Sequence, residues 1–426
     1  MPPDINLIDA DSYALNGPPY DQFRWLRDQH PVFWHELGGE NGWPGFWAIT
    51  RHADVEYVSR HPDVFSSHRR LALFQEMPQP SAIAAQRLMM LNMDPPQHTR
   101  QRRFVSRGFT PRMISQLEEK IRQICNALVD DVAHRGEADL LRDISAPLPL
   151  RVLCMLLGAP AEDHDYLLGL STQIVGGESG DPQDADDPAA EEAMASAATE
   201  YFIYANDLAR ERRANPVDDI VSQLLRPDDN GELLTAEEFD YFMLMLAVAG
   251  TETTRNASAA GLLAFFQHPE QWQRLRADRR LIPTAVEEIV RWVTPVNLFR
   301  RTASRDTEIA GQRISEGDKV VVFYSAANRD EDAFANPSAF DIGRDPNPHL
   351  GFGGGGPHFC LGRHLAALQL RVLLETLLQR MPDLTQAGEA VRVCSYFSNG
   401  ISQLPVRFTP SAPLAAGLPA AARPAA

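Results

Sequence analysis

Apolar positions recur every three to four residues over most of the chain, which is the spacing of amphipathic helices. The longest such pattern begins after Thr235, a predicted N-cap with Glu238 as its capping-box partner, and continues to Gln267. Its middle, residues 242–249, is apolar on all sides, so we expect this helix to be buried. Further helices are predicted at residues 20–29, 51–60, 114–133, 148–157, 162–174, 189–214, 284–292 and 365–380.

Alternating apolar and polar residues predict a smaller number of strands. These lie at residues 31–36, 45–50, 299–303, 307–309 and 319–324. Clusters of Gly, Pro, Asn and acidic residues interrupt the pattern elsewhere. They predict an irregular N-terminal arm (residues 1–19), a mobile lid (71–90), an exposed acidic connection (176–188) and a disordered Ala/Pro-rich tail (411–426).

Composition narrows the class of protein. The chain has 426 residues, a 44% hydrophobic content and a formal net charge of −17, which disfavours nucleic acid as a partner. No apolar run approaches the ~20 residues of a membrane span, and the N-terminus lacks the basic and apolar regions of a signal peptide. The four cysteines form no CxxC pair, which argues against a disulfide scaffold or a zinc site. These features predict a cytoplasmic protein.

The segment Gly351-Phe-Gly-Gly-Gly-Gly-Pro-His-Phe-Cys360-Leu-Gly362 combines backbone freedom with one cysteine. Its glycines would let the backbone lie against a flat ligand, and the following helix would stabilise a thiolate at its N-terminus. A thiolate is one of the axial ligands of haem iron. An inert thiol beside a Gly-rich turn and a phosphate-binding loop are the alternatives, although no Gly-Lys-Ser/Thr closes the motif.

Two further segments carry candidate chemistry. His98 and Arg102 are one helical turn apart, so they could bind two carboxylates of a ligand, or simply belong to a solvated basic face with Arg100, Arg103 and Arg107. In the long helix, Thr253 could turn its hydroxyl onto the carbonyl of Ala249 and open the helix at Gly250. Such an opening, with Glu252 beside it, could hold water and pass protons.

Simple ion pairs between neighbouring turns of a helix could account for some of these charged residues. Glu252 and Arg255 are three residues apart and could pair with each other. Glu288 and Arg291 have the same spacing, which usually gives a surface salt bridge of little energetic value.

These motifs together resemble those of the bacterial cytochromes P-450. The Cys360 loop, Ala249-Gly-x-Glu-Thr-Thr, Glu288-x-x-Arg291 and His98-x-x-x-Arg102 occur in the order and rough spacing of that family. The resemblance implies a mainly α fold with a small β-rich lobe, formed as one domain by residues 20–410. It also implies that haem b lies between the long helix and the helix after Cys360.

Roles for individual residues follow from this resemblance. Cys360 would be the axial thiolate and the metal ligand, and the haem propionates would be bound by His98, Arg102, Arg301 and His358. The oxygen groove would be formed by Ala249, Gly250, Glu252 and Thr253, with the last two delivering protons. Glu288 and Arg291 would be a buried structural pair. The substrate would approach Met245, Val248, Asn297, Phe299 and Phe397.

Within the family, Met90-Leu-Asn-Met-Asp-Pro-Pro, the Cys360 loop and Ser398-Asn-Gly-Ile are similar to those of enzymes that hydroxylate sterol side chains and methyl-branched lipids. The implied activity is a monooxygenase that uses O2, a separate ferredoxin with its reductase, and a bulky hydrophobic substrate (a steroid, branched isoprenoid or terpenoid). The ferredoxin would dock on Arg100, Arg103 and Arg107. The alternatives are a peroxide-driven peroxygenase, whose members replace the acid–Thr pair with Arg-Pro, and a non-catalytic haem sensor or carrier.

Overall fold

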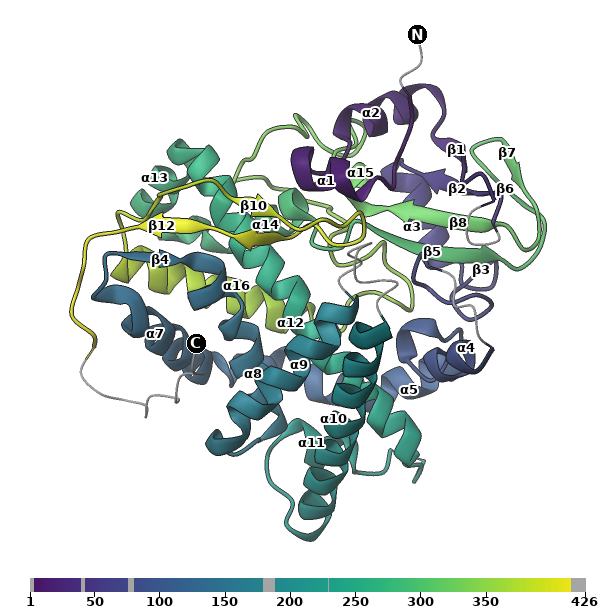
Figure 1. Ribbon diagram of the computed structural model, residues 1–426. Coiled ribbons are helices and arrows are strands. Elements are labelled where there is room, and N and C mark those ends of the chain that lie inside the picture. The colour runs from purple at the N-terminus through teal and green to yellow at the C-terminus, as the bar shows by residue number, and fades with distance from the viewer. Residues whose placement is uncertain (1–3, 40–42, 76–79, 179–187, 229, 415–426) are drawn as a thin grey trace.

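The computed structural model describes residues 4–39, 43–75, 80–178, 188–228 and 230–414 (Figure 1). Helices form the larger part and strands gather in a smaller lobe, so the predicted fold class is confirmed. The larger helices are α2 (Tyr20–Gln29), α3 (His52–Arg60), α5 (Gln97–Ser106), α7 (Glu118–Ala133), α8 (Pro147–Leu157), α9 (His164–Glu178), α10 (Pro188–Ala214), α12 (Ala236–Gln267), α13 (Pro269–Ala277), α14 (Ile282–Val293) and α16 (Arg363–Arg380). Short helices include α1 (Ala10–Asn16), α4 (Pro80–Gln86), α6 (Pro111–Ser115), α11 (Ile220–Leu224) and α15 (Tyr324–Ala327).

The strand-rich lobe is built on one mixed sheet. Its strands run in the order β1 (Val32–Glu36), β2 (Gly45–Ile49), β8 (Lys319–Phe323), β5 (Leu298–Ala303) and β3 (Phe65–Ser66). β8 pairs parallel with β2 and antiparallel with β5, so it joins the N-terminal hairpin to the strand that carries Arg301. Smaller sheets pair β6 (Thr307–Ile309) with β7 (Gln312–Ile314), β10 (Val391–Arg392) with β11 (Ile401–Gln403), and β12 (Pro405–Arg407) with β4 (Glu137–Asp139) and β9 (Thr385–Gln386).

Helix α12 crosses the helical part and packs against α8, α14, α10 and α16. It begins at the predicted capping box: Thr235 Oγ1 accepts from the Glu238 N–H, and the Glu238 carboxylate accepts from the Thr235 N–H. The predicted bounds of this helix are therefore confirmed. Because neighbouring helices cover most of its sides, Phe242, Ala247 and Leu262 are each no more than 1% exposed.

Glu288 and Arg291 of α14 are both fully buried and form a bidentate pair, with N···O distances of 2.8 and 2.7 Å. Arg291 also donates to the carbonyls of Asn328, Pro337 and Ala339, and Arg344 donates to Glu288. The surface salt bridge that spacing alone suggested is thus wrong. Burying two charges requires such extra hydrogen bonds to offset desolvation, and here they pin the 328–344 segment to α14.

Several predicted boundaries need correction. Residues 4–19 are not wholly irregular, because Asp9 accepts from the Ser12 N–H and caps α1. The expected helix 114–133 is divided between α6 and α7. The described parts of the lid contain α4, and the Asn92 side chain accepts from the Ala72 N–H and donates to the Gln86 carbonyl, which orders both ends.

The described start of the C-terminal tail is also ordered rather than free. The Ser411 N–H donates to the Ala133 carbonyl, and the Leu414 N–H donates to the Asp130 carboxylate. Most of the acidic connection (179–187), part of the lid (76–79) and the remaining tail (415–426) lie outside the described residues.

Candidate active site

A mostly apolar cavity of about 280 Å³ lies at the junction of the two lobes. It is bounded by α12, α8, the start of β5 and the loop that ends at Cys360. Its lining includes Met90, Leu91, His98, Arg102, Phe109, Val152, Leu153, Leu156, Met245, Leu246, Ala249, Gly250, Thr253, Val296, Phe299, Arg301, Phe352, His358 and Cys360. Residues more than 250 positions apart therefore meet around one space.

Cys360 is fixed by its backbone, because its N–H donates to the Phe352 carbonyl at 2.9 Å. Burial raises the pKa of the Cys360 thiol, although the Gly362 N–H and the charges of Arg102 and Arg363 oppose that rise. The N–H groups at the start of α16 thus favour the thiolate, as expected from the sequence, but burial outweighs them in the absence of a metal. A thiolate at this position needs a bound cation, since a metal ion deprotonates a coordinating thiol.

The glycines of the loop serve packing against α3. A Cβ on Gly354 would lie 2.5 Å from Ser59 Oγ, and one on Gly356 would lie 2.3 Å from the Ser59 carbonyl oxygen. Gly353, Gly355 and Gly356 also have positive φ angles, which side chains rarely adopt. The loop fits between the cavity and α3 because its backbone is bare on the α3 side, while Gly351 and Gly353 line the cavity, where the sequence predicted contact with a flat ligand.

Four cationic or imidazole groups gather at one edge of the cavity. The rings of His98 and His358 are 4.4 Å apart, and Ser67 Oγ lies 3.2 Å from His358 Nε2. Arg102 donates to the carbonyls of Pro357 and Phe359 at 2.8 and 2.5 Å. Burial, assisted by the charge of Arg102, lowers the pKa of His98 to about 4.

The wall formed by α12 has the predicted contact between Thr253 and Ala249, but the helix is continuous there, so the predicted opening is not observed. Thr253 Oγ1 donates to the Ala249 carbonyl at 2.8 Å, and both residues line the cavity together with Gly250. Glu252 lies elsewhere: its Oε1 accepts from Ser398 Oγ at 2.8 Å and does not line the cavity. Ser398 comes from the C-terminal segment, so no local sequence signal could have predicted this contact.

Comparison with known proteins agrees with this geometry. The family model for cytochrome P450 matches residues 188–406. A steroid C26-monooxygenase of Mycolicibacterium smegmatis is 42% identical over 416 residues, which cover 96% of this chain and 95% of that protein. The chain belongs to the cytochrome P450 family.

Two other relatives widen the comparison. A methyl-branched lipid omega-hydroxylase of Mycobacterium bovis is 42% identical over 414 residues, covering 95% of each chain. A solved cytochrome P450 of Mycobacterium marinum in complex with pseudoionone superposes with a TM-score of 0.86 at 38% identity, covering 96% of this chain and 99% of that one. The protein is accordingly a P450 monooxygenase.

The residues of this P450 fit the haem-thiolate cofactor of the family. Neither ring nitrogen of the buried His98 has a hydrogen-bond partner within the described chain. Burial lowers the pKa of the Arg301 guanidinium, whose Nη1 donates only to the Arg300 carbonyl. Buried polar groups of this kind require partners, and the two propionates of a haem would supply anionic ones. Cys360 would bind the iron, with His98, Arg102, Arg301 and His358 around the propionates.

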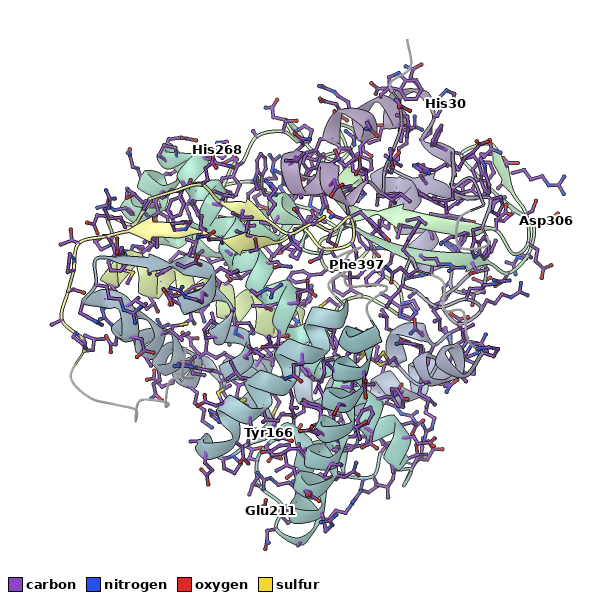
Figure 2. All side chains as sticks on the ribbon, in the orientation of Figure 1. His30, Tyr166, Glu211, His268, Asp306 and Phe397 are labelled. Atoms are coloured by element: carbon purple, nitrogen blue, oxygen red, sulfur yellow. The ribbon has the colours of Figure 1, made fainter. Side chains whose placement is uncertain are left out.

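Of the five predicted substrate residues, the structure places Met245 and Phe299 in the cavity lining, whereas Val248, Asn297 and Phe397 are outside it. Phe397 packs on Phe299 with ring centroids 5.6 Å apart, and Figure 2 shows it on the C-terminal segment where the lobes meet. It therefore supports the cavity wall from behind. Sequence reasoning missed Leu91, Phe109, Val152 and Leu156, which come from three separate segments, the last two from α8.

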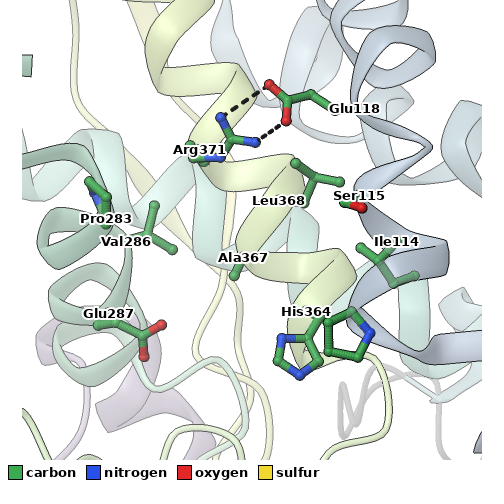
Figure 3. Close-up of a pocket in the computed structure, with 11 residues that line it drawn as sticks. Ile114, Ser115, Glu118, Pro283, Val286, Glu287, His364, Ala367, Leu368 and Arg371 are labelled. Atoms are coloured by element: carbon green, nitrogen blue, oxygen red, sulfur yellow. Dashed lines mark hydrogen bonds and ion pairs between the residues drawn. The ribbon is translucent and has the colours of Figure 1, made fainter. Parts of the chain in front are cut away.

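A second pocket of the P450 lies between α6, α14 and α16 (Figure 3). His364, four residues after Cys360, lines it together with Glu287, and Arg371 donates to Glu118 across its upper edge at 2.5 Å. None of the predicted catalytic or cofactor residues lines this pocket.

The arginines of the basic face that was expected to receive a ferredoxin form ion pairs and hydrogen bonds within the chain, although Arg103 remains 47% exposed. Arg100 pairs with Glu238 at 2.6 Å and with Glu232 at 3.2 Å, and Arg103 pairs with Asp228 at 2.5 Å. Arg107 donates to the Pro227 carbonyl. The acids that neutralise these arginines lie just before α12 (Asp228 and Glu232) and in its first turn (Glu238), and their position beside α5 was not visible in the sequence.

Proposed function

We propose that this P450 binds haem b and hydroxylates an unactivated C–H bond of a bulky, mostly apolar substrate: a steroid, a branched isoprenoid or a terpenoid. The apolar cavity above Cys360 carries this proposal. Its substrate-facing part is lined by Met, Leu, Val and Phe side chains, and Arg102 and Arg301 are at the propionate edge. Pockets of this kind bind ligands through apolar contact and orient them with few polar groups.

The names of relatives support the same substrate class. Two describe action on steroids and on methyl-branched lipids, and a solved relative holds pseudoionone. Adaptable Met and Leu side chains, such as Met90, Met245 and Leu156, suit a branched chain better than a flat aromatic ring. A separate ferredoxin with its reductase is the proposed electron source.

The mechanism assigns distinct tasks to the protein. When bound, haem would supply the activation of O2, which is the source of the inserted oxygen atom. Thr253 is proposed to hold a water molecule at the cavity wall beside Gly250, because its hydroxyl already bonds the Ala249 carbonyl there. Glu252, one residue away, is proposed to provide the protons. The apolar lining excludes other water and holds the substrate near the reacting oxygen.

Binding titrations test the substrate class. Cholesterol and androstenediol share a ring system, but only cholesterol carries the branched side chain. If the cavity takes a branched apolar chain, cholesterol and branched isoprenoids will cause the spectral shift that reports loss of water from haem iron, and benzoate will not. Tight binding of benzoate, with no response to any sterol, isoprenoid or terpenoid, would contradict the proposal.

A further inference from the structure

Glu252 belongs to a closed ring of four side chains on the side of α12 away from the cavity. Arg255 Nε donates to Asn256 Oδ1 at 3.3 Å, and Asn256 Nδ2 donates to Ser398 Oγ at 2.8 Å. Ser398 Oγ in turn donates to Glu252 Oε1 at 2.8 Å, and Arg255 Nη2 lies 3.7 Å from the same oxygen. Three members come from α12, and Ser398 alone comes from another segment.

The ring is buried except at one place. Asn256, Ser398 and Glu252 are 0%, 3% and 8% exposed, whereas 27% of the Arg255 side chain is exposed. Water therefore reaches the ring at Arg255. The Glu252 carboxylate contacts Arg255 at this wet edge, and Thr253, the next residue along the helix, lines the cavity.

Ser398 is held by a rigid turn, residues 395–400. Its own N–H donates to Ser395 Oγ at 3.0 Å, and the next N–H, of Asn399, donates to the Pro295 carbonyl at 3.0 Å. A Cβ on Gly400 would lie only 2.6 Å from Asn256 Oδ1, so this turn touches α12 through bare backbone. The Ser398 hydroxyl is thus a donor held in place by the turn, and its position does not depend on α12.

We propose that the ring formed by Glu252, Arg255, Asn256 and Ser398 is the holding position in which Glu252 collects a proton from solvent, and that Ser398 is its positioning residue. The proposal rests on the proposed proton role of Glu252. As a carboxylate, Glu252 is retained by the Ser398 hydroxyl and the Arg255 charge, because charge-assisted hydrogen bonds are the stronger kind.

Protonation releases the side chain. A hydronium ion at the Arg255 edge gives its proton to the carboxylate and leaves as water. The neutral acid loses its attraction to Arg255 and half of its hydrogen-bond strength, so it can rotate towards Thr253. There it passes the proton to the water held by Thr253 and returns as a carboxylate. The ring therefore couples the charge of Glu252 to its orientation.

The test measures hydrogen peroxide released per NADH consumed, with a surrogate ferredoxin, its reductase and cholesterol. Ser398→Ala should raise this ratio about 3- to 10-fold, the range that one ordinary hydrogen bond controls. It should also enlarge the solvent deuterium isotope effect on NADH consumption, which a purely structural defect would leave unchanged. Ser398→Thr keeps the hydroxyl and should restore both values. Ser402→Ala changes an exposed serine of the neighbouring strand, which bonds the Val391 carbonyl, and should match the wild type.

A second measurement does not depend on turnover. Thermal unfolding of Ser398→Ala, Glu252→Ala and the double variant should show Tm losses that do not add, because both single changes break the same bond. Additive Tm losses would contradict the proposed ring but not the proton role of Glu252. The same would follow if Ser398→Ala released as little peroxide as the wild type while Glu252→Gln released more. Wild-type peroxide release by Glu252→Gln would overturn the proton role of Glu252, and the ring with it.

Discussion

Single residues give the active site its positive character. His98, Arg102 and Arg301 are drawn to one cavity edge, where the two arginines bond to backbone carbonyl oxygens rather than to carboxylates. Such groups are costly to bury until an anion arrives. Cys360 is in a similar state, since burial keeps it a thiol in the absence of a metal. Each of these residues is therefore arranged for a partner that the chain itself does not provide.

Replacement of Cys360 tests the metal ligand. Cys360→Ser should abolish the red-shifted Soret band of the reduced carbon-monoxide complex, because that band requires sulfur donation to iron. Cys125→Ser and Cys154→Ser should retain it, since burial raises the pKa of each thiol to about 12 and keeps both protonated. Cys394→Ser is a third control. Loss of the band in any control that remains folded would exclude Cys360 as the ligand.

The protonation of His98 predicts a pH dependence. The folded pKa of about 4 lies below the ordinary value of 6.5, so the unfolded chain binds this proton more readily. In the haem-free protein, the contribution of His98 to stability is complete above pH 6.5 and is lost as the pH falls to about 4, by about 3 kcal/mol. His98→Gln should remove that share of the acid sensitivity.

Denaturant unfolding of both proteins across this pH range measures the difference. With haem bound, the propionates stabilise the protonated ring and the difference should shrink. Equal pH dependence of wild type and His98→Gln without haem would show that the ring is not held neutral.

At the scale of elements, the Cys360 loop depends on the surface of α3. The contact requires bare backbone at Gly354 and Gly356, which face Ser59 and the adjacent chain. The loop then carries Cys360 to the start of α16 and Arg102's carbonyl partners to α5. A helix from the strand-rich lobe thereby determines where the metal ligand stands.

Adding one methyl group to the loop should disturb this contact. Gly356→Ala places a Cβ about 2.3 Å from the Ser59 carbonyl oxygen at a φ of +70°. We expect a loss of about 2 kcal/mol or more in unfolding free energy, together with a lower haem content. Gly169→Ala, where a Cβ meets nothing within 4 Å inside α9, should instead gain about 0.5–1 kcal/mol. Similar stabilities of the two variants would contradict the packing role of the loop.

Elements differed in how well the sequence predicted them. Helix α12 was predicted at its correct bounds because its capping box is a local signal that packing did not override. α1 was missed because Pro and Gly on either side hid the Asp9 cap. The Glu252–Ser398 bond joins residues 146 positions apart, so neither spacing nor periodicity could reveal it. The same holds for the cavity residues Leu91, Phe109 and Val152, whose apolar character fits any core position.

Across the whole molecule, acidic and basic side chains are paired locally, which the net charge alone does not reveal. The formal net charge is −17, yet the arginines of α5 are neutralised by acids of the 228–238 segment. These ion pairs join α5, which carries His98 and Arg102, to the start of α12. Among the described residues, no helix has the length and apolar character needed to cross a membrane.

Because Arg103 forms an ion pair within the chain, we expect charge reversal at this residue to lower stability rather than only to weaken the docking of a ferredoxin. Arg103→Glu would face the buried Asp228 at a distance that now holds an ion pair, so the Tm should fall at every salt concentration tested. Reduction by a ferredoxin should slow equally at low and high salt. Arg112→Glu, on an exposed residue of α6, should keep the wild-type Tm. A defect of Arg103→Glu that appears only at low salt, with unchanged Tm, would instead identify Arg103 as a partner contact.

The position of Ser398 near the C-terminal end of the chain also means that it is synthesised late. Chains begin to fold from the N-terminal side during synthesis. Helix α12 is translated long before Ser398, and the Cys360 loop is translated between them. A nascent chain that ends just after α12 contains Glu252 without Ser398, and the α12 wall of the cavity without Cys360. A chain that ended before residue 398 would therefore lack the serine and could not form the proposed Glu252–Ser398 bond.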